Sequence, residues 1–252
     1  RSVKIPIKDE KGIQGMREAG QVAARVLRDM AQKVQPGVST LELDQYAKER
    51  IAFYGGKSAF LGYCGYPAQT CISVNEVVIH GIADSRRLVL GDIVSLDVGV
   101  LYNGYIGDNA KTVVVGGCSA EAQKLLNVTE TSLCKGIEQA RAGNKVSDIS
   151  RAVQEWVESN NCSVVREFVG HGVGRKLHEE PQVPNFWEGG KSPTLLPGMT
   201  LAIEPMVNLG GAAVKILKDG WTTVTKDGSL SAHFEHTVLI TNGEPEVLTW
   251  PD

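Results

Sequence analysis

The stretch VSLDVGVLYNGYIGDNAKTVVV, from Val94 to Val115, decides the fold, because the rest of the chain can be placed around it. It contains two runs rich in Val, Leu and Ile, a composition typical of buried strands. The runs meet at Asn103-Gly104, the dipeptide that best supplies the positive φ angles of a two-residue turn. The sequence therefore predicts an antiparallel hairpin.

Two acids of this hairpin fall on one face. The register set by the turn pairs Asp97 with Ala110 and Gly99 with Asp108, so the two aspartates are diagonal neighbours, with Cβ atoms roughly 7 Å apart or less. Buried carboxylates need a cation, an Arg or a catalytic role, because an unpaired one is costly or takes up a proton. A solvated face with two ordinary surface acids is the alternative that this stretch leaves open.

Composition narrows the class of protein. The 252 residues are 42% hydrophobic, enough for one large domain or two tightly fused halves. A net charge of -3 gives no electrostatic case for nucleic acid or an acidic membrane surface as a partner. Five cysteines without a CxxC pair argue against a disulfide framework and against a thiolate zinc site, so we expect reduced thiols in a cytoplasmic compartment.

The chain has no feature that predicts a membrane protein. No apolar run approaches the ~20 residues of a membrane span, and no signal peptide opens the chain. Because the first residue is Arg1 rather than Met, a targeting segment could have been removed upstream, which keeps an organelle open as an alternative compartment.

Two helices are predicted before the hairpin. Apolar residues at helical spacing favour a long amphipathic helix from about Asp9, its N-cap, to Val34. Ser39 with Glu42 three residues later reads as a capping box, which predicts a second helix running to about Tyr54.

Two more helices are predicted after the hairpin. Ser119 is expected to cap one that runs to about Ala142, and Ser147 to cap another that ends at Asn160-Asn161. Strands and Gly-rich loops fill most of residues 164–248. This order predicts an α+β protein.

The order of two helices followed by strands occurs twice, which suggests an internal repeat. Gly143 lies 106 positions after Gly37, and Gly198 lies 107 positions after Gly91. Any two αβ halves can share a Gly before a strand, but that explains one landmark more easily than two. We therefore expect a single catalytic domain over residues 1–252, with related halves at roughly 9–116 and 119–250.

The repeat predicts where four acids meet. Asp97 lies six residues after Gly91, and Glu204 lies six residues after Gly198, while Asp108 precedes the closing run TVVVG (112–116) and Glu235 the similar run TVLIT (237–241). The inference is that these four carboxylates come from the two halves to a shared interface.

An imidazole narrows the chemistry of that interface. His171 lies between glycines that let its backbone approach an ion or a substrate. Oxygen ligands with one nitrogen suit Mn, Fe(II), Co or Zn better than Ca or Mg. Four carboxylates could hold two divalent ions ~3.5 to 4 Å apart, an arrangement that binds a hydroxide and polarises a carbonyl for hydrolysis.

The other histidines are weaker candidates. His178 lies seven residues after His171, so it is a poor prospect as a ligand and a fair one as a hydrogen-bond donor to substrate. His80 could equally be a core histidine. We interpret His233 and His236, which flank Glu235, as structural residues whose side chains point away from it.

Several separated motifs now resemble a known family. They are HGVGRKLHEEPQ (171–182), AIEPM (202–206), FEHT (234–237) and the hairpin with its two aspartates. Together they resemble methionine aminopeptidases of the type I bacterial and organellar kind, in the same order and over nearly the whole chain.

The resemblance implies a pita-bread fold, in which two pseudo-symmetric αβ halves surround a curved antiparallel sheet. It implies a metalloaminopeptidase that hydrolytically removes the initiator methionine from nascent proteins when the second residue is small. The expected partners are the N-termini of nascent polypeptides, with ribosome contact left open, no nucleic-acid motif, no membrane and a monomeric state.

The resemblance also implies roles for particular residues. Glu204 would be the acid/base for a hydroxide activated by two metal ions, His80 would handle the substrate amine or leaving group, and His178 would stabilise the oxyanion. The ions would be Co, Mn, Fe(II) or Zn, with the ligands Asp97, Asp108, His171, Glu204 and Glu235, of which Asp108 and Glu235 bridge.

A methionine pocket is implied in the same way. With His80 and His178, the substrate-binding residues would be Phe60, Tyr63, Tyr66, Cys71, Leu177 and Trp221. Plain core packing is the competing interpretation, and it is the better one for Tyr63 and Tyr66 taken alone.

Three positions depart from the family pattern. Leu177 stands where Phe is general, Phe60 where Cys is frequent, and His233 where Gln is common. These departures affect the shape of the pocket and the surroundings of the metal ions.

Three other functions are alternatives on this fold. An Xaa-Pro aminopeptidase or prolidase generally carries an extra N-terminal domain, and only about 95 residues precede Asp97. A type II methionine aminopeptidase carries a large insertion, whereas 33 positions separate His171 from Glu204. A metal-free binding protein is the third alternative, and it ranks low because all five ligand positions are filled.

Overall fold

The predicted hairpin is present with the predicted register. The computed structural model describes residues 4–252. Strands β4 (Ile93–Tyr102) and β5 (Tyr105–Val114) pair so that Asp97 lies opposite Ala110, and Gly99 opposite Asp108. Asn103 and Gly104 in the turn have φ angles of 47° and 85°, as the twist of a two-residue hairpin requires.

Helices α1 (Glu10–Lys33) and α2 (Thr40–Phe53) begin where their caps predict. The side chain of Asp9 accepts from the Gly12 N–H at 2.8 Å. In α2 the Ser39 hydroxyl accepts from the Glu42 N–H at 3.0 Å, and the Glu42 carboxylate accepts from the Ser39 N–H at 3.1 Å. Both capping predictions are confirmed, because these bonds depend only on neighbours in sequence.

Helices α3 (Ala120–Glu138) and α4 (Val146–Ser159) each differ from prediction at one end. Ser119 caps α3 as expected, but the helix ends before Ala142, in a turn where the Ala140 N–H donates to the Ile137 carbonyl. The prediction of Ser147 as the cap of α4 was wrong. Asp148 accepts from the Lys145 N–H at 2.8 Å and so defines the start, while the Ser147 N–H donates to Ser192.

The remaining strands are short, and every pairing is antiparallel. β1 (Lys57–Ser58), β4 and β2 (Cys71–Val74) form a sheet that β5 extends. A five-stranded sheet has the order β15 (Glu246–Val247), β14 (His236–Leu239), β9 (Thr200–Ile203), β7 (Gly170–Gly172) and β8 (Glu179–Val183). Two three-stranded sheets complete the set: β13 (Ser231–His233), β10 (Met206–Asn208) and β6 (Ser163–Val164); and β11 (Val214–Ile216), β12 (Thr223–Thr225) and β3 (Val77–Ile79). A short 3-10 turn, η1 (Tyr63–Gly65), follows β1.

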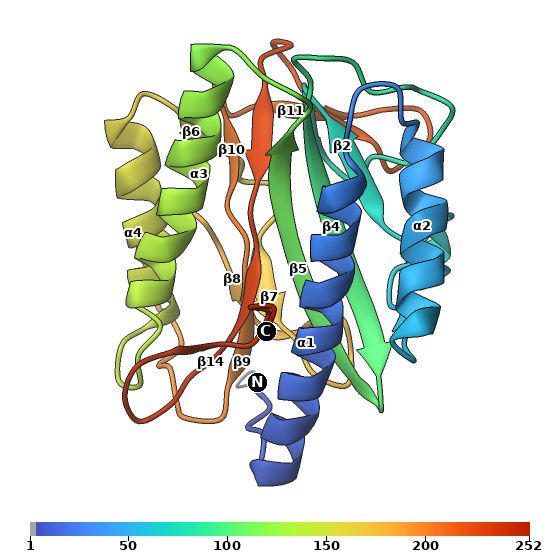
Figure 1. Ribbon diagram of the computed structural model, residues 1–252. Helices are drawn as coiled ribbons and strands as arrows, with labels where there is room; N and C mark the ends of the chain where they lie inside the picture. Colours follow the sequence, from blue (N-terminus) through green and yellow to red (C-terminus); the bar gives the residue numbers. More distant parts are fainter. Residues whose placement is uncertain (1–3) are drawn as a thin grey trace.

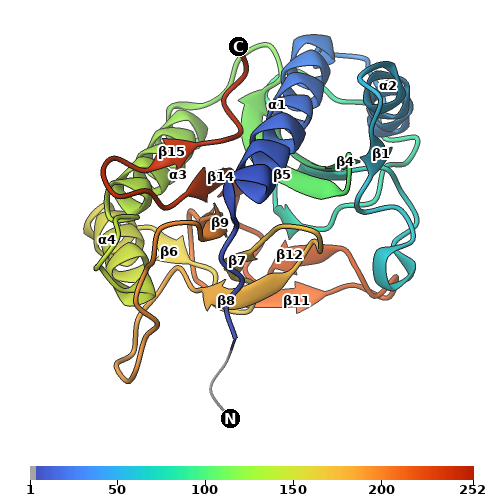
Figure 2. The same cartoon turned by 90° about the horizontal axis from the view of Figure 1, so that it is seen from below.

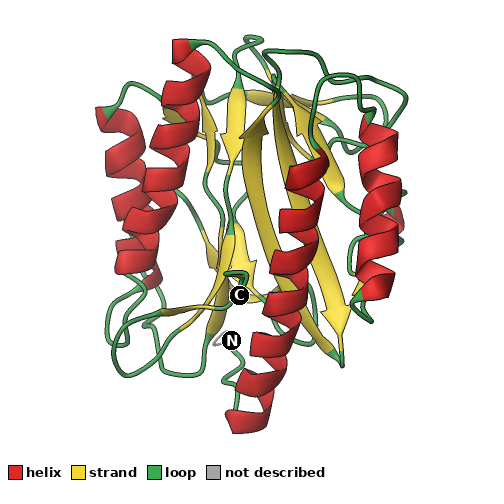
Figure 3. Cartoon of the chain, viewed as in Figure 1, coloured by secondary structure: helices red, strands yellow, loops and turns green. Residues whose placement is uncertain are grey.

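The helices form one layer and the strands another, as the α+β prediction requires. Figure 1 shows α1 and α2 in front of one end of the sheets and α3 and α4 in front of the other end. Figure 2, seen from below, has α1 and α2 above the strands, α3 and α4 to the left beside β6, and β8, β11 and β12 on the side away from α1 and α2. Figure 3 shows the two long strands of the β4–β5 hairpin passing behind α1, with α3 and α4 to one side and α2 to the other. Each helix pair covers its own group of buried apolar side chains.

Close packing holds α1 against β5. A Cβ atom added to Gly107 in β5 would lie 2.3 Å from the carbonyl oxygen of Ala19 in α1, so only glycine fits there. No helix within residues 4–252 combines the length and the apolarity needed to cross a bilayer.

The β4–β5 hairpin is joined to the second half of the chain along β5. Ala110 and Glu235 exchange both backbone hydrogen bonds, at 3.1 and 2.9 Å. Thr237 donates from its hydroxyl to the Asp108 carbonyl at 2.7 Å. Residues 233–237 therefore run as a partner strand to β5, which brings acids far apart in sequence to one place.

Candidate metal centre and substrate pocket

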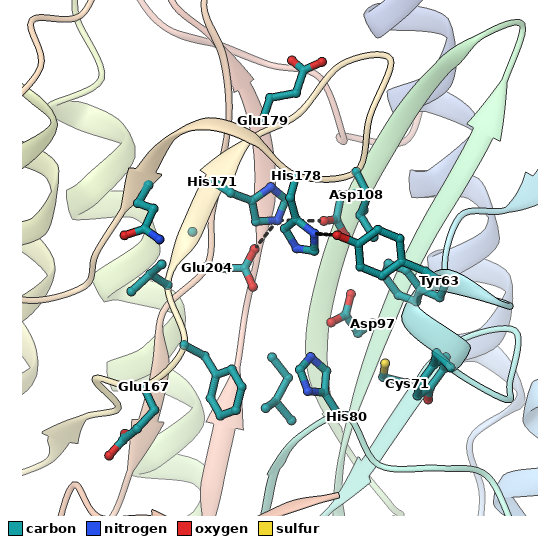
Figure 4. A pocket seen from close by; sticks show the side chains of 18 of the residues that line it. Tyr63, Cys71, His80, Asp97, Asp108, Glu167, His171, His178, Glu179 and Glu204 are labelled. Carbon is teal, nitrogen blue, oxygen red and sulfur yellow. Dashed lines mark hydrogen bonds and ion pairs between the residues drawn. The ribbon is translucent and has the colours of Figure 1, made fainter. Parts of the chain in front are cut away.

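The five predicted ligands come from five different segments and meet. Asp97 and Asp108 lie within β4 and β5, His171 lies in β7, Glu204 directly follows β9, and Glu235 lies between β13 and β14. Asp108, His171, Glu204 and Glu235 each offer one ligand atom, and these four atoms all lie within 4.8 Å of one another. Figure 4 shows Asp97, Asp108, His171 and Glu204 turned toward the same space.

The ring of His171 is oriented by its own strand. Its Nδ1 atom is 2.8 Å from the Gly172 carbonyl oxygen, which leaves Nε2 toward the acids, 3.4 Å from Asp108 and 3.2 Å from Glu204 (Figure 4). A Cβ at Gly172 would lie 2.2 Å from the carbonyl oxygen of Glu180, so this glycine lets β7 and β8 approach closely.

The buried acids have carboxylate oxygens for which their protein neighbours supply no hydrogen bond. Asp97, Asp108, Glu204 and Glu235 are between 1% and 7% exposed. Within residues 4–252, one oxygen of each of the first three and both oxygens of Glu235 have no hydrogen-bond partner. Unpaired buried carboxylate oxygens are costly, and a divalent cation is the group that would satisfy several at once.

The pKa values of the cluster reflect crowded negative charge. Burial, followed by the charges of neighbouring acids, raises the pKa of Asp97 and Glu235 well above the usual range. Burial alone would also raise the pKa of Glu204, but its interactions with Glu235 and the nearby imidazoles hold it well below the usual range. Burial alone would lower the pKa of His171, but Asp108 and Glu204 raise it.

His233 is not where we expected it. The expectation that it points away from Glu235 was wrong, because strand side chains alternate with a period of two and His233 is two positions before Glu235. Its ring is 1% exposed, with Nδ1 4.0 Å from Asp97 and Nε2 3.7 Å from Glu204. His236 does point elsewhere, since its Nδ1 lies 2.8 Å from the Thr249 hydroxyl. The two-residue spacing was the signal in the sequence that could have found His233.

A cavity of about 500 Å³ opens onto the cluster. Its lining contains every predicted site residue except Glu235. The lining includes the predicted substrate-binding residues Phe60, Tyr63, Tyr66, Cys71, His80, Leu177, His178 and Trp221. Tyr63 and Tyr66 both line the cavity, and Tyr66 also packs within a buried apolar cluster, as the competing core interpretation expects. Gln182 and Phe168 also line it and were missed; Gln182 lies opposite His171 in the β7–β8 pairing.

Two further histidines stand at the cavity wall. The Nδ1 atom of His178 is 2.7 Å from the Tyr63 hydroxyl, and its ring centroid is 4.3 Å from that of His171 (Figure 4). The ring of His80 packs edge-on against Phe168, with centroids 5.2 Å apart. Burial lowers the pKa of both, that of His80 to about 4, so both rings are neutral at pH 7.

Comparison with known proteins places this site in a family. The model of metallopeptidase family M24 matches residues 14–242. A methionine aminopeptidase of Clostridium perfringens is 53% identical over 97% of this chain and 98% of its own length. Methionine aminopeptidase 1 of Bacillus subtilis is 51% identical over 93% of this chain and 94% of its own length.

Solved structures agree with the sequence matches. The methionine aminopeptidase of Rickettsia prowazekii has a TM-score of 0.96 at 40% identity, covering 98% of this chain and 100% of its own. A prolidase from Pyrococcus furiosus has a TM-score of 0.78 at 22% identity and is covered over 66% of its length, a likeness of fold alone. The full-length matches confirm the predicted pita-bread fold and favour methionine over Xaa-Pro substrates. The chain therefore belongs to metallopeptidase family M24 and, within that family, to the methionine aminopeptidases.

Proposed function

We propose that this enzyme hydrolyses the bond after the initiator methionine of nascent proteins whose second residue is small, with two divalent metal ions. The observation that carries the proposal is the meeting of two unlike surfaces in one cavity. One is the buried cluster of carboxylates, and the other is an apolar wall of aromatic and sulfur-containing side chains. The first suits a metal ion and the second suits a thioether side chain.

The apolar wall is proposed as the methionine pocket. Cys71 lies directly opposite Asp97 in the β2–β4 pairing, so the pocket is continuous with the acid cluster. Tyr66 is 3% exposed, donates to the Thr70 carbonyl at 2.7 Å and packs edge-on against Trp221. Aromatic rings and a buried thiol offer the polarisable contacts that a methionine sulfur prefers.

The acid cluster is proposed as the site of two ions, which would be Co, Mn, Fe(II) or Zn. Asp97, Asp108, His171, Glu204 and Glu235 would hold them, with Asp108 and Glu235 shared. Ions bound there would activate a water molecule for attack and polarise the scissile carbonyl group. The unpartnered oxygens described above support this proposal.

Protein side chains are proposed to move and place the protons. Glu204 belongs to the acid cluster and lines the cavity, so its carboxylate is placed to accept a proton from the attacking water and pass it to the leaving amine. If the Tyr63 hydroxyl donates to Nδ1 of His178, the Nε2–H of His178 becomes a donor for the developing oxyanion. His80 is neutral and can accept a hydrogen bond from the substrate amine.

The preference for a small second residue is proposed from crowding beside the cluster. The His80–Phe168 and His171–His178 ring pairs both lie at the cavity, with centroids 5.2 and 4.3 Å apart. These four rings limit the room for a side chain that follows the methionine.

Other parts of the proposal concern the setting of the enzyme. We propose that it acts in the cytoplasm as a monomer on nascent chains, near the ribosome. The five cysteines are all free, which supports a reducing compartment. We also propose that residues 9–116 and 119–250 are related halves, since α1 with α2 and α3 with α4 form equivalent pairs at either end of the sheets (Figure 1).

The test uses short peptides and protein loaded with each metal ion without oxygen. We expect free methionine from Met-Ala-Ser and almost none from Met-Leu-Ser. Glu204→Gln should abolish release while circular dichroism stays unchanged, and the exposed control Glu244→Gln should keep normal rates. Equal hydrolysis of both peptides, cleavage of Xaa-Pro peptides, or near-normal rates in Glu204→Gln would each contradict the part concerned.

A further inference from the structure

We propose that His233 is a sixth ligand of the metal centre, binding the ion that Asp97 and Glu235 hold. Each of the two ions would then have one imidazole, His171 on one side and His233 on the other. This extends the proposed two-ion site and rests on it for the presence of the ions, but it concerns metal binding and can be tested without a peptide substrate.

Two groups of side chains, each suited to one ion, carry the proposal. Asp108, His171, Glu204 and Glu235 form one group, and Asp97, His233 and Glu235 form the other. Within each group the ligand atoms lie within 4.8 Å of one another, and Glu235 belongs to both. A carboxylate common to two groups is placed to bridge two ions, and both groups contain an imidazole.

The backbone around His233 holds its ring on the cavity side. The His233 N–H donates to the Thr112 hydroxyl at 2.9 Å, and that hydroxyl donates to the His233 carbonyl at 2.9 Å. Two positions later Glu235 pairs with Ala110, so His233 and Glu235 share one face of an extended segment. The ring is thus fixed by a strand pairing rather than by a loop.

The imidazole lacks a partner that would explain its burial. Its Nε2 atom is buried and has no hydrogen-bond partner anywhere in residues 4–252. The carboxylates at 3.7 and 4.0 Å are beyond hydrogen-bonding distance. A buried imidazole nitrogen facing acids without bonding them is what a ligand position looks like before an ion is added, and imidazole is the commonest metal ligand in proteins.

The proposal has a consequence for the choice of metal. A second imidazole makes the centre richer in nitrogen, which shifts selectivity from Mn toward Co and Zn. The substitution His233→Gln keeps a polar side chain at this position. Gln can still form a hydrogen bond with Glu204, but it is a far weaker metal ligand. The variant should therefore lose metal affinity if His233 is a ligand, and keep it if His233 only orients Glu204.

The experiment counts imidazoles at the metal centre and measures ion binding. Wild type, His233→Gln and the matched control His236→Gln are loaded with Co(II) without oxygen, and their proton NMR spectra are recorded. Each imidazole bound to Co(II) contributes one strongly shifted N–H signal that exchanges with solvent. We expect two such signals in wild type and His236→Gln, and one in His233→Gln.

Calorimetric titration of the same proteins gives the second readout. We expect His233→Gln to weaken one of the two Co(II) binding steps by at least about 10-fold, since even residues behind the ligands change metal affinity by roughly 10- to 100-fold. Weakening for Mn should be smaller. One shifted signal in wild type, or two unchanged binding steps in His233→Gln, would overturn the assignment.

Two safeguards keep the test decisive. If His233→Gln does not fold, the signal count in wild type labelled at its histidines still decides. If peptide cleavage fails while two imidazole signals are present, the proposed substrate is wrong and His233 is a ligand. If the peptide is cleaved while only one imidazole signal is present, His233 is not a ligand and the substrate proposal is unaffected.

Discussion

Replacing Glu235 with Gln should make the metal-free protein more stable as it disables the metal centre. Glu235 is 1% exposed, and neither carboxylate oxygen has a hydrogen-bond partner in the described chain. Burial, and then the charges of Asp108 and Glu204, raise its pKa well above the usual range. Without metal ions, the folded protein must therefore bind a proton here or carry an uncompensated buried charge.

The size of the effect follows from proton linkage. Because the pKa is raised in the folded state, the stability that this group contributes is present at low pH and is lost as the pH rises toward the folded pKa. For one proton the loss cannot exceed about 1.4 kcal/mol per pH unit, so it is at most about 3 kcal/mol between about pH 5 and about pH 7. Gln does not titrate, so Glu235→Gln should escape this loss.

Urea unfolding in the presence of a chelator measures the free energy of unfolding at both pH values. We expect the free energy of unfolding of wild type, relative to that of Glu235→Gln, to fall from about pH 5 to about pH 7, by at most about 3 kcal/mol. The exposed control Glu244→Gln should follow wild type. Added Co(II) should stabilise wild type far more than Glu235→Gln. If the free energy of unfolding changed with pH in the same way in wild type and Glu235→Gln, buried Glu235 would not destabilise the metal-free protein and the reasoning would be refuted.

Three further substitutions test how the site is supported. In wild type the Lys8 ammonium lies 2.7 Å from the largely buried Glu179 carboxylate. Lys8→Met removes this partner and should lower the free energy of unfolding in urea by about 3 kcal/mol. No change would mean that solvent replaces the lysine. Tyr63→Phe should lower kcat for Met-Ala-Ser more than it raises KM, because it removes the hydrogen bond to His178; a change in KM alone would limit Tyr63 to binding. Gly107→Ala should lower the free energy of unfolding by about 1 to 3 kcal/mol, since the added Cβ meets an α1 carbonyl, and unchanged stability would show that α1 can shift.

Local chemistry in the sequence was enough for the hairpin and for three of the four helix starts. Asn103-Gly104 has the turn geometry that determines the β4–β5 register, and Ser39 with Glu42 forms a capping box whose partners are three residues apart. The prediction for Ser147 failed because Asp148 accepts from the Lys145 N–H, which starts the helix at Val146 and leaves Ser147 inside its first turn. That bond joins residues three positions apart, so it was visible in the sequence, whereas the contact of the Ser147 N–H with Ser192 depends on the tertiary structure.

The site also depends partly on the local sequence and partly on the tertiary structure. The sequence by itself determined which side chains could carry the chemistry, and its two-residue alternation already placed His233 on the face of Glu235. The repeat predicted that the four acids meet, but only the tertiary structure shows how, because the pairing of β5 with residues 233–237 joins segments more than a hundred positions apart. Non-local strand pairing depends on backbone hydrogen bonds and packing that no short stretch of sequence encodes, and here it places four buried acids and two imidazoles at one point.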